Sequence, residues 1–113
     1  MSTTLTLRHS GDVLIIGISG RLTLSGGAGN LRDAIREAVA RGERKVLLNL
    51  TDTSYVDSVG IGELVCGFTN LTNHGAQLKL LVLGEGVKDL LQTTKLDRVF
   101  DVHEDEGVAI QSF

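Results

Sequence analysis

The sequence predicts a small α/β domain in which a mixed β-sheet begins with an N-terminal hairpin and carries about four packed α-helices. Residues 4–8 and 13–19 are strand-like segments separated by Gly11-Asp12, a spacing typical of a hairpin. After residue 31, helical patterns of apolar residues alternate with short apolar segments. A hairpin followed by strand–helix alternation favours a mixed sheet with crossover helices. With 113 residues the chain can bury one core, so we expect a single domain over residues 1–113.

Two strands open the chain. Residues 4–8 alternate polar and apolar side chains, as a half-buried strand does. Residues 13–19 are almost continuously apolar, which indicates a strand buried on both faces. We therefore expect the second strand near the centre of the sheet, with the first strand paired beside it.

A helix is predicted after a glycine-rich loop over residues 25–30. Its apolar positions share one helical face, and they are Leu31, Ile35, Ala38 and Val39. Glycine clusters start helices poorly, so Ser25 or Asn30 is the expected N-terminal cap. Gly42 is expected to end the helix.

The centre of the chain combines a buried strand, a loop and a second helix. Residues 45–50 are apolar enough for a buried strand, and the polar residues 51–54 are expected to form a loop. Helical spacing then predicts a core-facing set of Ile61, Leu64, Val65, Phe68 and Leu71. The opposite face would carry Val59, Gly62, Cys66, Asn70 and Asn73. Its first turns are small and apolar, which suits close docking of another protein.

The last third of the chain predicts two more strands and two short helices. Residues 77–83 form an apolar, strand-like segment, and the turn at 84–86 leads into a short helix. Leu96 and Val99-Phe100 lead to a brief edge strand, and the acidic residues 104–106 that follow it open a final helix. Acidic side chains favour the positive end of a helix, so we expect their role to be structural.

Composition excludes several classes of function. The net charge is −3 and no basic stripe is present, so nucleic-acid binding is not expected. No segment approaches the ~18–20 apolar residues that span a bilayer, and the first residues lack a signal-peptide pattern. The single Cys66 cannot form an internal disulfide and shares no metal-ligand spacing with the three histidines. We therefore expect a cytoplasmic protein with no metal site and no direct membrane insertion.

Ser58 is the candidate functional residue. It falls where the strand and loop give way to the second helix, so it meets unpaired backbone N–H groups and the positive end of the helix dipole. A hydroxyl there is expected to be accessible, and a phosphate on it would be tolerated. Either Ser58 or Asp57 could be the N-cap, with Asp57 favoured. Gly60 and Gly62 either admit the backbone of a partner or relieve crowding in the first turn.

Two other kinds of site fit the pattern less well. A hydrolase nucleophile elbow places glycine two residues before the serine, and Val56 stands there. His103 follows in the chain, but no convincing acid precedes it. A dinucleotide-binding loop would need a third glycine at Val65 after Gly60-x-Gly62. We therefore expect no catalytic residues.

The ordered set of segments resembles the STAS domain family, specifically the stand-alone anti-sigma factor antagonists of bacteria. Residues 56–62 (VDSVGIG) are similar to the family's D-S-S-G-L-G element, and residues 46–50 resemble the strand that precedes it. Gly20-Arg21-Leu22 matches the turn after the second strand, and residues 87–100 resemble the family's C-terminal pattern. The resemblance covers nearly the whole chain.

The resemblance implies a switch controlled by phosphorylation. The unphosphorylated form would bind an anti-sigma factor, a serine kinase with an ATPase fold, and would thereby free a sigma factor. Phosphorylation of Ser58 by that kinase would dissociate the complex, and a serine phosphatase would remove the phosphate again. The chain itself would need no cofactor, because ATP and magnesium belong to the kinase.

The helix face and the resemblance together give a set of expected partner contacts. These are Asp57, Val59, Gly60, Gly62, Cys66, Arg21 and Thr23. Val59 replaces a second serine often found in the family, which leaves Ser58 as the only hydroxyl of the element. Thr23 stands where many members carry an aspartate. The alternative keeps the fold and makes the chain a STAS interaction module within a larger signalling or transporter assembly.

Overall fold

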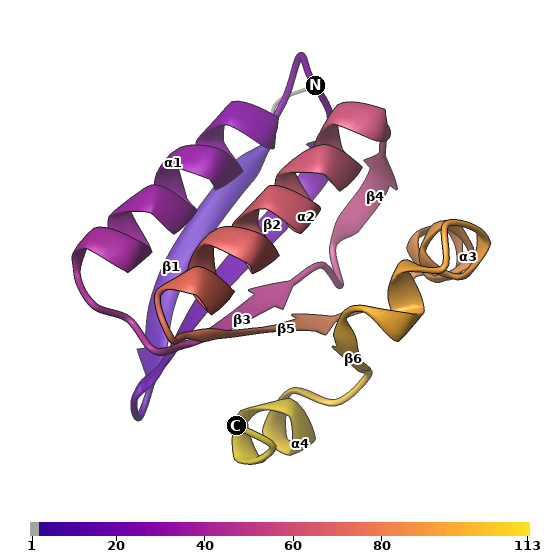
Figure 1. The fold of residues 1–113 in the computed structure, drawn as a ribbon. Coiled ribbons are helices and arrows are strands. Elements are labelled where there is room, and N and C mark those ends of the chain that lie inside the picture. Colours follow the sequence, from indigo (N-terminus) through magenta and orange to yellow (C-terminus); the bar gives the residue numbers. More distant parts are fainter. Residues whose placement is uncertain (1–2) are drawn as a thin grey trace.

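The computed structural model describes residues 3–113, and Figure 1 shows the path of the chain. In chain order its elements are β1 (Thr4–Ser10), β2 (Val13–Leu22), α1 (Ala28–Ala40), β3 (Lys45–Asn49), β4 (Thr53–Val56), α2 (Ser58–Asn73), β5 (Gln77–Leu81), α3 (Glu85–Thr93), a 3₁₀ helix (Leu96–Arg98), β6 (Asp101–His103) and α4 (Glu106–Gln111). The predicted class, a mixed sheet with a leading hairpin and four helices, is confirmed.

The sheet has the strand order β1-β2-β3-β5-β6, and β4 pairs with the end of β2. β1 and β2 are antiparallel, whereas the remaining pairs are parallel. The hairpin turn consists of Gly11 and Asp12, between the paired residues Ser10 and Val13. Gly11 has a φ of +59° and Asp12 lies outside the positive region, which is the pattern of a type II′ turn with glycine in first place.

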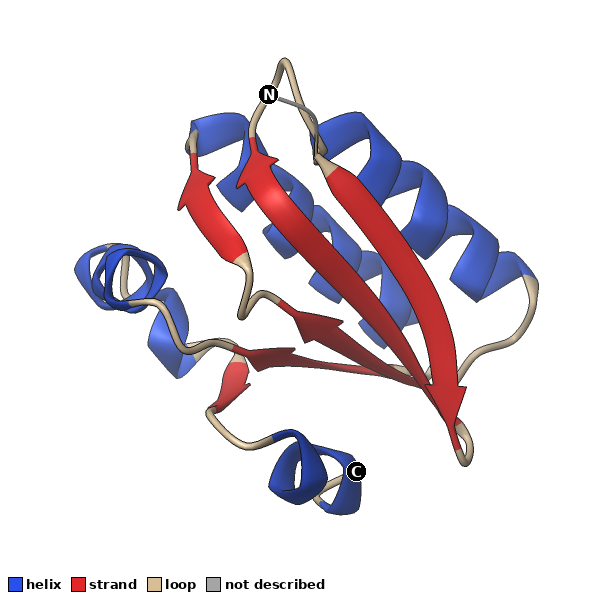
Figure 2. Cartoon of the chain, turned by 180° about the vertical axis from the view of Figure 1, so that it is seen from behind, coloured by secondary structure: helices blue, strands red, loops and turns tan. Residues whose placement is uncertain are grey.

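Hydrophobic clusters lie on both faces of the sheet. Figure 1 shows α1 and α2 side by side over one face, where buried residues of these helices meet the inward residues of β2, β3 and β5. The opposite face is shown in Figure 2, and α4 covers part of it. There Ala109 packs with a smaller cluster formed by Val13, Ile15, Leu47 and Leu81. Alternate residues of the same strands supply the two clusters, as the pleat of a sheet requires.

Residues 53–56 form a strand, so the prediction of a loop over 51–54 was wrong for its second half. β4 runs parallel to β2 and pairs with Gly20–Leu22. Thr53 is buried, and its Oγ1 donates a hydrogen bond of 2.9 Å to the carbonyl oxygen of Ile18. The polar atom is satisfied by the neighbouring backbone, so a threonine and a serine can open a strand without any apolar pattern.

The first helix begins at Ala28, earlier than Leu31, and the predicted caps were wrong. Gly27 is the N-cap residue, with a φ of +90° and no side-chain hydrogen bond. Backbone bonds between Thr23 and Gly26 (2.6 and 3.1 Å) fold the loop tightly enough to start the helix without Ser25 or Asn30. Gly42 follows the last turn with a φ of +75°, so its predicted role is confirmed.

The predicted core-facing set of the second helix is confirmed for Ile61, Leu64, Phe68 and Leu71, which pack in or against the core, and is wrong for Val65. The buried residues of α2 are Gly60, Leu64, Gly67 and Leu71, whereas Val65 is exposed. Gly67 lies against Ile35 of α1, where an added Cβ would come within 2.4 Å of the Ile35 Cδ1 atom. Gly60 and Gly67 therefore also take core positions on this helix, which the apolar pattern did not predict.

The acidic residues before α4 have the structural role that was predicted. The Asp105 carboxylate accepts a 2.9 Å hydrogen bond from the backbone N–H of Val108 and caps the helix, and Glu106 lies in its first turn. Glu104 forms an ion pair with Lys88 at 3.0 Å. Within residues 3–113, no helix combines the length and the apolar character needed to cross a bilayer.

Candidate functional site

The candidate site lies at the N-terminus of α2, directly after β4. Asp57 is the N-cap residue, in an extended conformation, and Ser58 is the first residue of the helix. The Asp57 Oδ1 atom accepts a 2.8 Å hydrogen bond from the backbone N–H of Gly60. Asp57 therefore caps the N-terminus of α2, as predicted from the sequence. The Ser58 side chain is exposed to solvent.

Asp57 also ties a second segment to the helix. Its Oδ2 atom accepts a 3.1 Å hydrogen bond from the backbone N–H of Leu24, in the loop between β2 and α1. The N–H groups of Gly60 and then Leu24 lower the pKa of Asp57 below its ordinary value of 3.8, because both stabilise the ionised form. One carboxylate thus joins the β2–α1 loop to the start of α2.

Gly60 is buried because the first turn of α2 lies against the end of β2. An added Cβ would come within 2.2 Å of the Leu22 carbonyl oxygen and 2.8 Å of the Val56 Cγ1 atom. The same carbonyl accepts a 3.2 Å hydrogen bond from the N–H of Asp57. The close backbone approach expected at Gly60 is therefore made by the chain itself. In contrast, nothing lies within 4 Å of the corresponding position at Gly62.

The other expected partner contacts divide into surface and interior residues. Val59 and Cys66 are exposed on α2. Arg21 is exposed and lies over the Tyr55 ring, 5.0 Å from its centroid. Thr23 is only 6% exposed, and its Oγ1 donates to the Gly26 carbonyl at 3.3 Å, so its main contacts are within the loop. Gly60 and Thr23 therefore contribute little to the surface around Ser58.

Two exposed apolar side chains near this site were missed. Leu24 is 75% exposed on the loop that Asp57 holds, and Tyr55 is 51% exposed on β4. Tyr55 and Asp57 line a shallow pocket of about 440 Å³ together with Arg21, Thr23, Ser25 and Gly26. Residues 53–56 show no alternation of burial, because Thr53 and Val56 are buried and Ser54 and Tyr55 are exposed, so strand periodicity does not reveal the exposure of Tyr55. We use the name Ser58 surface for a set of five exposed residues and the half-buried Gly62, namely Leu24, Tyr55, Ser58, Val59, Gly62 and Cys66.

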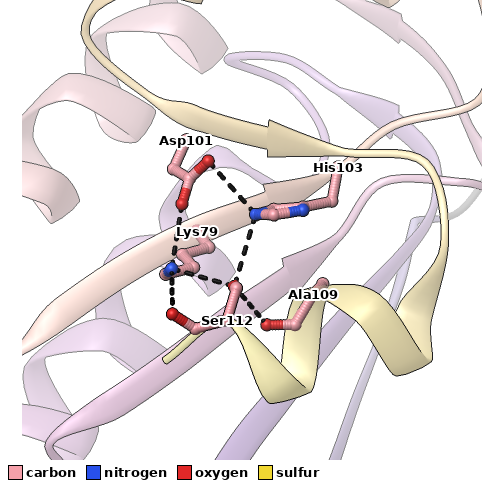
Figure 3. A network of polar contacts seen from close by, with 5 residues as sticks. All are labelled: Lys79, Asp101, His103, Ala109 and Ser112. Atoms are coloured by element: carbon pink, nitrogen blue, oxygen red, sulfur yellow. Dashed lines mark hydrogen bonds and ion pairs between the residues drawn. The ribbon is translucent and has the colours of Figure 1, made fainter.

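His103 belongs to a different cluster, shown in Figure 3. Its Nε2 atom lies 3.1 Å from Asp101 Oδ1 and 3.4 Å from Ser112 Oγ, so the acid and the hydroxyl share one ring nitrogen. A hydrolytic triad needs them on opposite nitrogens. Ser112 Oγ instead donates to the Ala109 carbonyl at 2.6 Å and accepts from Lys79 Nζ at 2.9 Å. The cluster anchors α4 to β5 and β6.

No other chemistry gathers near Ser58. Within residues 3–113, no group of three or more histidine, cysteine, aspartate or glutamate side chains is arranged to hold a metal ion. The site consists of an accessible hydroxyl at a helix N-terminus, a capping carboxylate and a ring of small or apolar side chains.

Comparison with known proteins places this geometry in a family. A family model described as the STAS domain matches residues 4–109, and the chain belongs to the STAS domain family. An anti-sigma factor antagonist from Mycobacterium paratuberculosis has a similar structure, with a TM-score of 0.89 and 21% identity over 98% of this chain and 93% of that one. A putative anti-sigma factor antagonist from Thermotoga maritima gives a TM-score of 0.88 and 22% identity over 96% and 92%. SpoIIAA of Bacillus in its phosphorylated form gives 0.74 and 18% over 97% and 100%.

The two glycines of the first turns of α2 should respond oppositely to alanine. Gly60→Ala places a methyl group against the Leu22 carbonyl, and we expect it to lower the free energy of unfolding by about 1–3 kcal/mol. Gly62→Ala meets open space within a helix, and we expect it to raise that free energy by about 0.5–1 kcal/mol. Urea unfolding at neutral pH measures both. Equal effects of the two substitutions would contradict the packing described at Gly60.

Asp57 should give the protein an acid-sensitive component of stability. Its pKa is lowered in the folded state, so its contribution is present above pH 3.8 and is lost as the pH falls through the lower folded value. We expect Asp57→Asn to have a lower free energy of unfolding than the wild type at pH 6. In urea titrations the difference in unfolding free energy between the two proteins should become smaller towards pH 2. Asp52→Asn removes an exposed carboxylate that caps no helix and controls for net charge. A gap that stays constant with pH would refute the assignment.

Proposed function

We propose that the chain is an anti-sigma factor antagonist whose binding is controlled by phosphorylation of Ser58. The observation that carries the proposal is the exposed Ser58 hydroxyl at the first helical position of a STAS domain, where Asp57 already supplies the cap. The similarity to proteins described as anti-sigma factor antagonists supports it, and one of these, SpoIIAA, is described in a phosphorylated form. The partner would be an anti-sigma factor with serine kinase activity.

A phosphate on Ser58 would be compatible with the fold. It adds roughly −1.5 to −2 charges near neutral pH. The free N–H groups and the dipole of α2 would stabilise it by about 0.3–1 kcal/mol at an exposed position. The neighbouring Asp57 carboxylate is held by two backbone N–H groups and would repel the phosphate without losing its own bonds. The switch would therefore act without refolding.

The same phosphate would oppose docking on the Ser58 surface. Leu24, Tyr55 and Val59 lie in water in the free chain, and a partner covering them would remove water from the region of Ser58. A bulky dianion there would have to be desolvated or would face partner groups arranged around a neutral hydroxyl. Losing ~3–4 kcal/mol of binding free energy in this way lowers affinity several hundredfold. A serine phosphatase would restore binding. The chain would be substrate and switch in this cycle and would act in the cytoplasm.

Phosphorylation should occur at Ser58 alone. Incubation of the chain with its cognate anti-sigma factor, ATP and magnesium should add one phosphate, located by tandem mass spectrometry. Ser58→Ala should abolish incorporation, whereas Ser54→Ala, a change of another exposed serine on the adjacent strand, should not. Ser58→Asp should keep the wild-type circular dichroism and melting temperature and lose anti-sigma factor binding. Incorporation that persists in Ser58→Ala would overturn the proposal and favour a purely structural module.

Docking should require the open space at Gly62. We expect Gly62→Arg to abolish binding of the anti-sigma factor, measured by isothermal titration calorimetry, with little change in unfolding free energy because no atom lies within 4 Å of that position. Thr72→Arg introduces the same side chain at an exposed site in the last turn of α2 and should bind normally. Unaltered affinity of Gly62→Arg would remove α2 from the interface.

A further inference from the structure

The outer edge of β1 is a free strand edge. β1 is the terminal strand of the sheet, and within residues 3–113 no segment pairs with its outer side. Figure 2 shows the strand running unobstructed along that border. The strand is seven residues long, contains no proline, and keeps a continuous register with β2 from Thr4 to Ser10. It therefore lacks the bulges, prolines and short length that usually protect an edge.

The hairpin register determines which backbone groups face outward. A two-residue turn closes on the Ser10–Val13 pair, and pairs alternate along an antiparallel ladder. Ser10, Arg8, Thr6 and Thr4 therefore direct their N–H and C=O groups towards β2. Leu5, Leu7 and His9 direct theirs away from the sheet. The outward N–H and C=O groups of Leu5 and His9 therefore lie at equal distances along the strand on either side of those of Leu7.

The side chains on this edge are suited to pairing. Leu7 is 60% exposed and borders a groove of about 240 Å³. Its lining combines the apolar Leu14, Ala34 and Ala38 with the ionisable His9, Glu37, Arg41 and Glu43. The two ionisable groups of the strand have partners in their own chain. Arg8 forms an ion pair with Glu106, and His9 Nε2 lies 2.7 Å from Glu43. The edge therefore presents an exposed leucine between two ionisable side chains that already have partners in their own chain.

We propose that a second copy of this chain pairs antiparallel with β1 about a twofold axis at Leu7. In this register Leu7 faces Leu7 of the other copy, Leu5 faces His9, and Thr6 faces Arg8. No like charges stand opposite each other along the paired strands, and the two grooves beside Leu7 lie next to the axis. The outward N–H and C=O groups of Leu5, Leu7 and His9 all find partners. A register shifted by two residues would leave some of them unpaired.

The dimer would be weak and independent of the proposed function. One strand pair buries less area than the ~800 Å² per partner of a standard interface, so we expect a dissociation constant of about 10 µM to 1 mM. The pairing uses β1, which contributes no residue to the Ser58 surface. Failure of one proposal therefore leaves the other intact.

Sedimentation equilibrium of the purified chain tests the pairing directly. Between about 5 µM and about 1 mM, the weight-average mass should rise from 12.1 kDa towards twice that value. Leu7→Pro deletes an outward N–H, which an edge strand tolerates, and should stay monomeric with the wild-type circular dichroism. Leu24→Lys changes an even more exposed leucine away from the edge and should associate like the wild type. A wild type that stays monomeric, or a Leu24→Lys variant that loses association, overturns the proposal.

Hydrogen exchange on the unmodified protein provides a second test that does not depend on a variant folding. The amides of Leu5, Leu7 and His9 should gain protection as concentration rises, because they become paired only in the dimer. The amides of Thr6 and Arg8 should be protected at every concentration, because they point to β2. Protection that rises equally at all five amides, or at none of them, contradicts the register.

Discussion

The contact between the first turn of α2 and the end of β2 is the constraint on which the candidate site depends. The Leu22 carbonyl accepts the N–H of Asp57 and lies so close to Gly60 that no side chain fits there. This contact fixes where the helix begins and how it is turned about its axis. Ser58 is consequently directed to solvent, while Gly60, Leu64 and Leu71 are directed to the core. The exposure of one hydroxyl thus follows from a backbone contact two residues away.

The helix at the candidate site is capped by Asp57 and not by Ser58. A serine that caps a helix uses its oxygen to accept a backbone N–H, and its modification would then disturb the helix. Here the Asp57 carboxylate satisfies the N–H groups of both Gly60 and Leu24. The Ser58 oxygen is therefore not the atom that accepts the capping hydrogen bond. Chemistry at Ser58 can therefore be separated from stability, which a reversible modification requires.

Much of the fold could be predicted from the sequence because its apolar patterns are strong. The nearly continuous apolar segment of β2 and the 3.6-residue pattern of α1 identified those elements. β4 was missed because Thr53 is buried through a hydrogen bond to Ile18 rather than through apolar contact. The start of α1 was missed because backbone bonds in a tight loop replace a side-chain cap.

The site was predicted less completely than the fold, for a physical reason. A glycine in a sequence does not reveal what faces it, and the atom that excludes a side chain at Gly60 belongs to the distant Leu22. Gly62, in the same helix, meets nothing. Likewise, the burial of Gly67 depends on the closeness of Ile35 in α1, which the sequence of α2 does not show. Local patterns carry no information on such contacts between distant segments.

The formation of α4 depends on its packing against the small hydrophobic cluster on its own face of the sheet. A helix of six residues is far shorter than the ~12–15 residues at which isolated helices become marginally stable in water. α4 is therefore ordered only while Ala109 packs on Val13, Ile15 and Leu47 and while Lys79 holds the backbone and hydroxyl of Ser112. Detachment of α4 would expose the apolar side chains of Val13, Ile15, Leu47 and Leu81 to water. The cluster beneath α1 and α2, on the other face of the sheet, does not include α4.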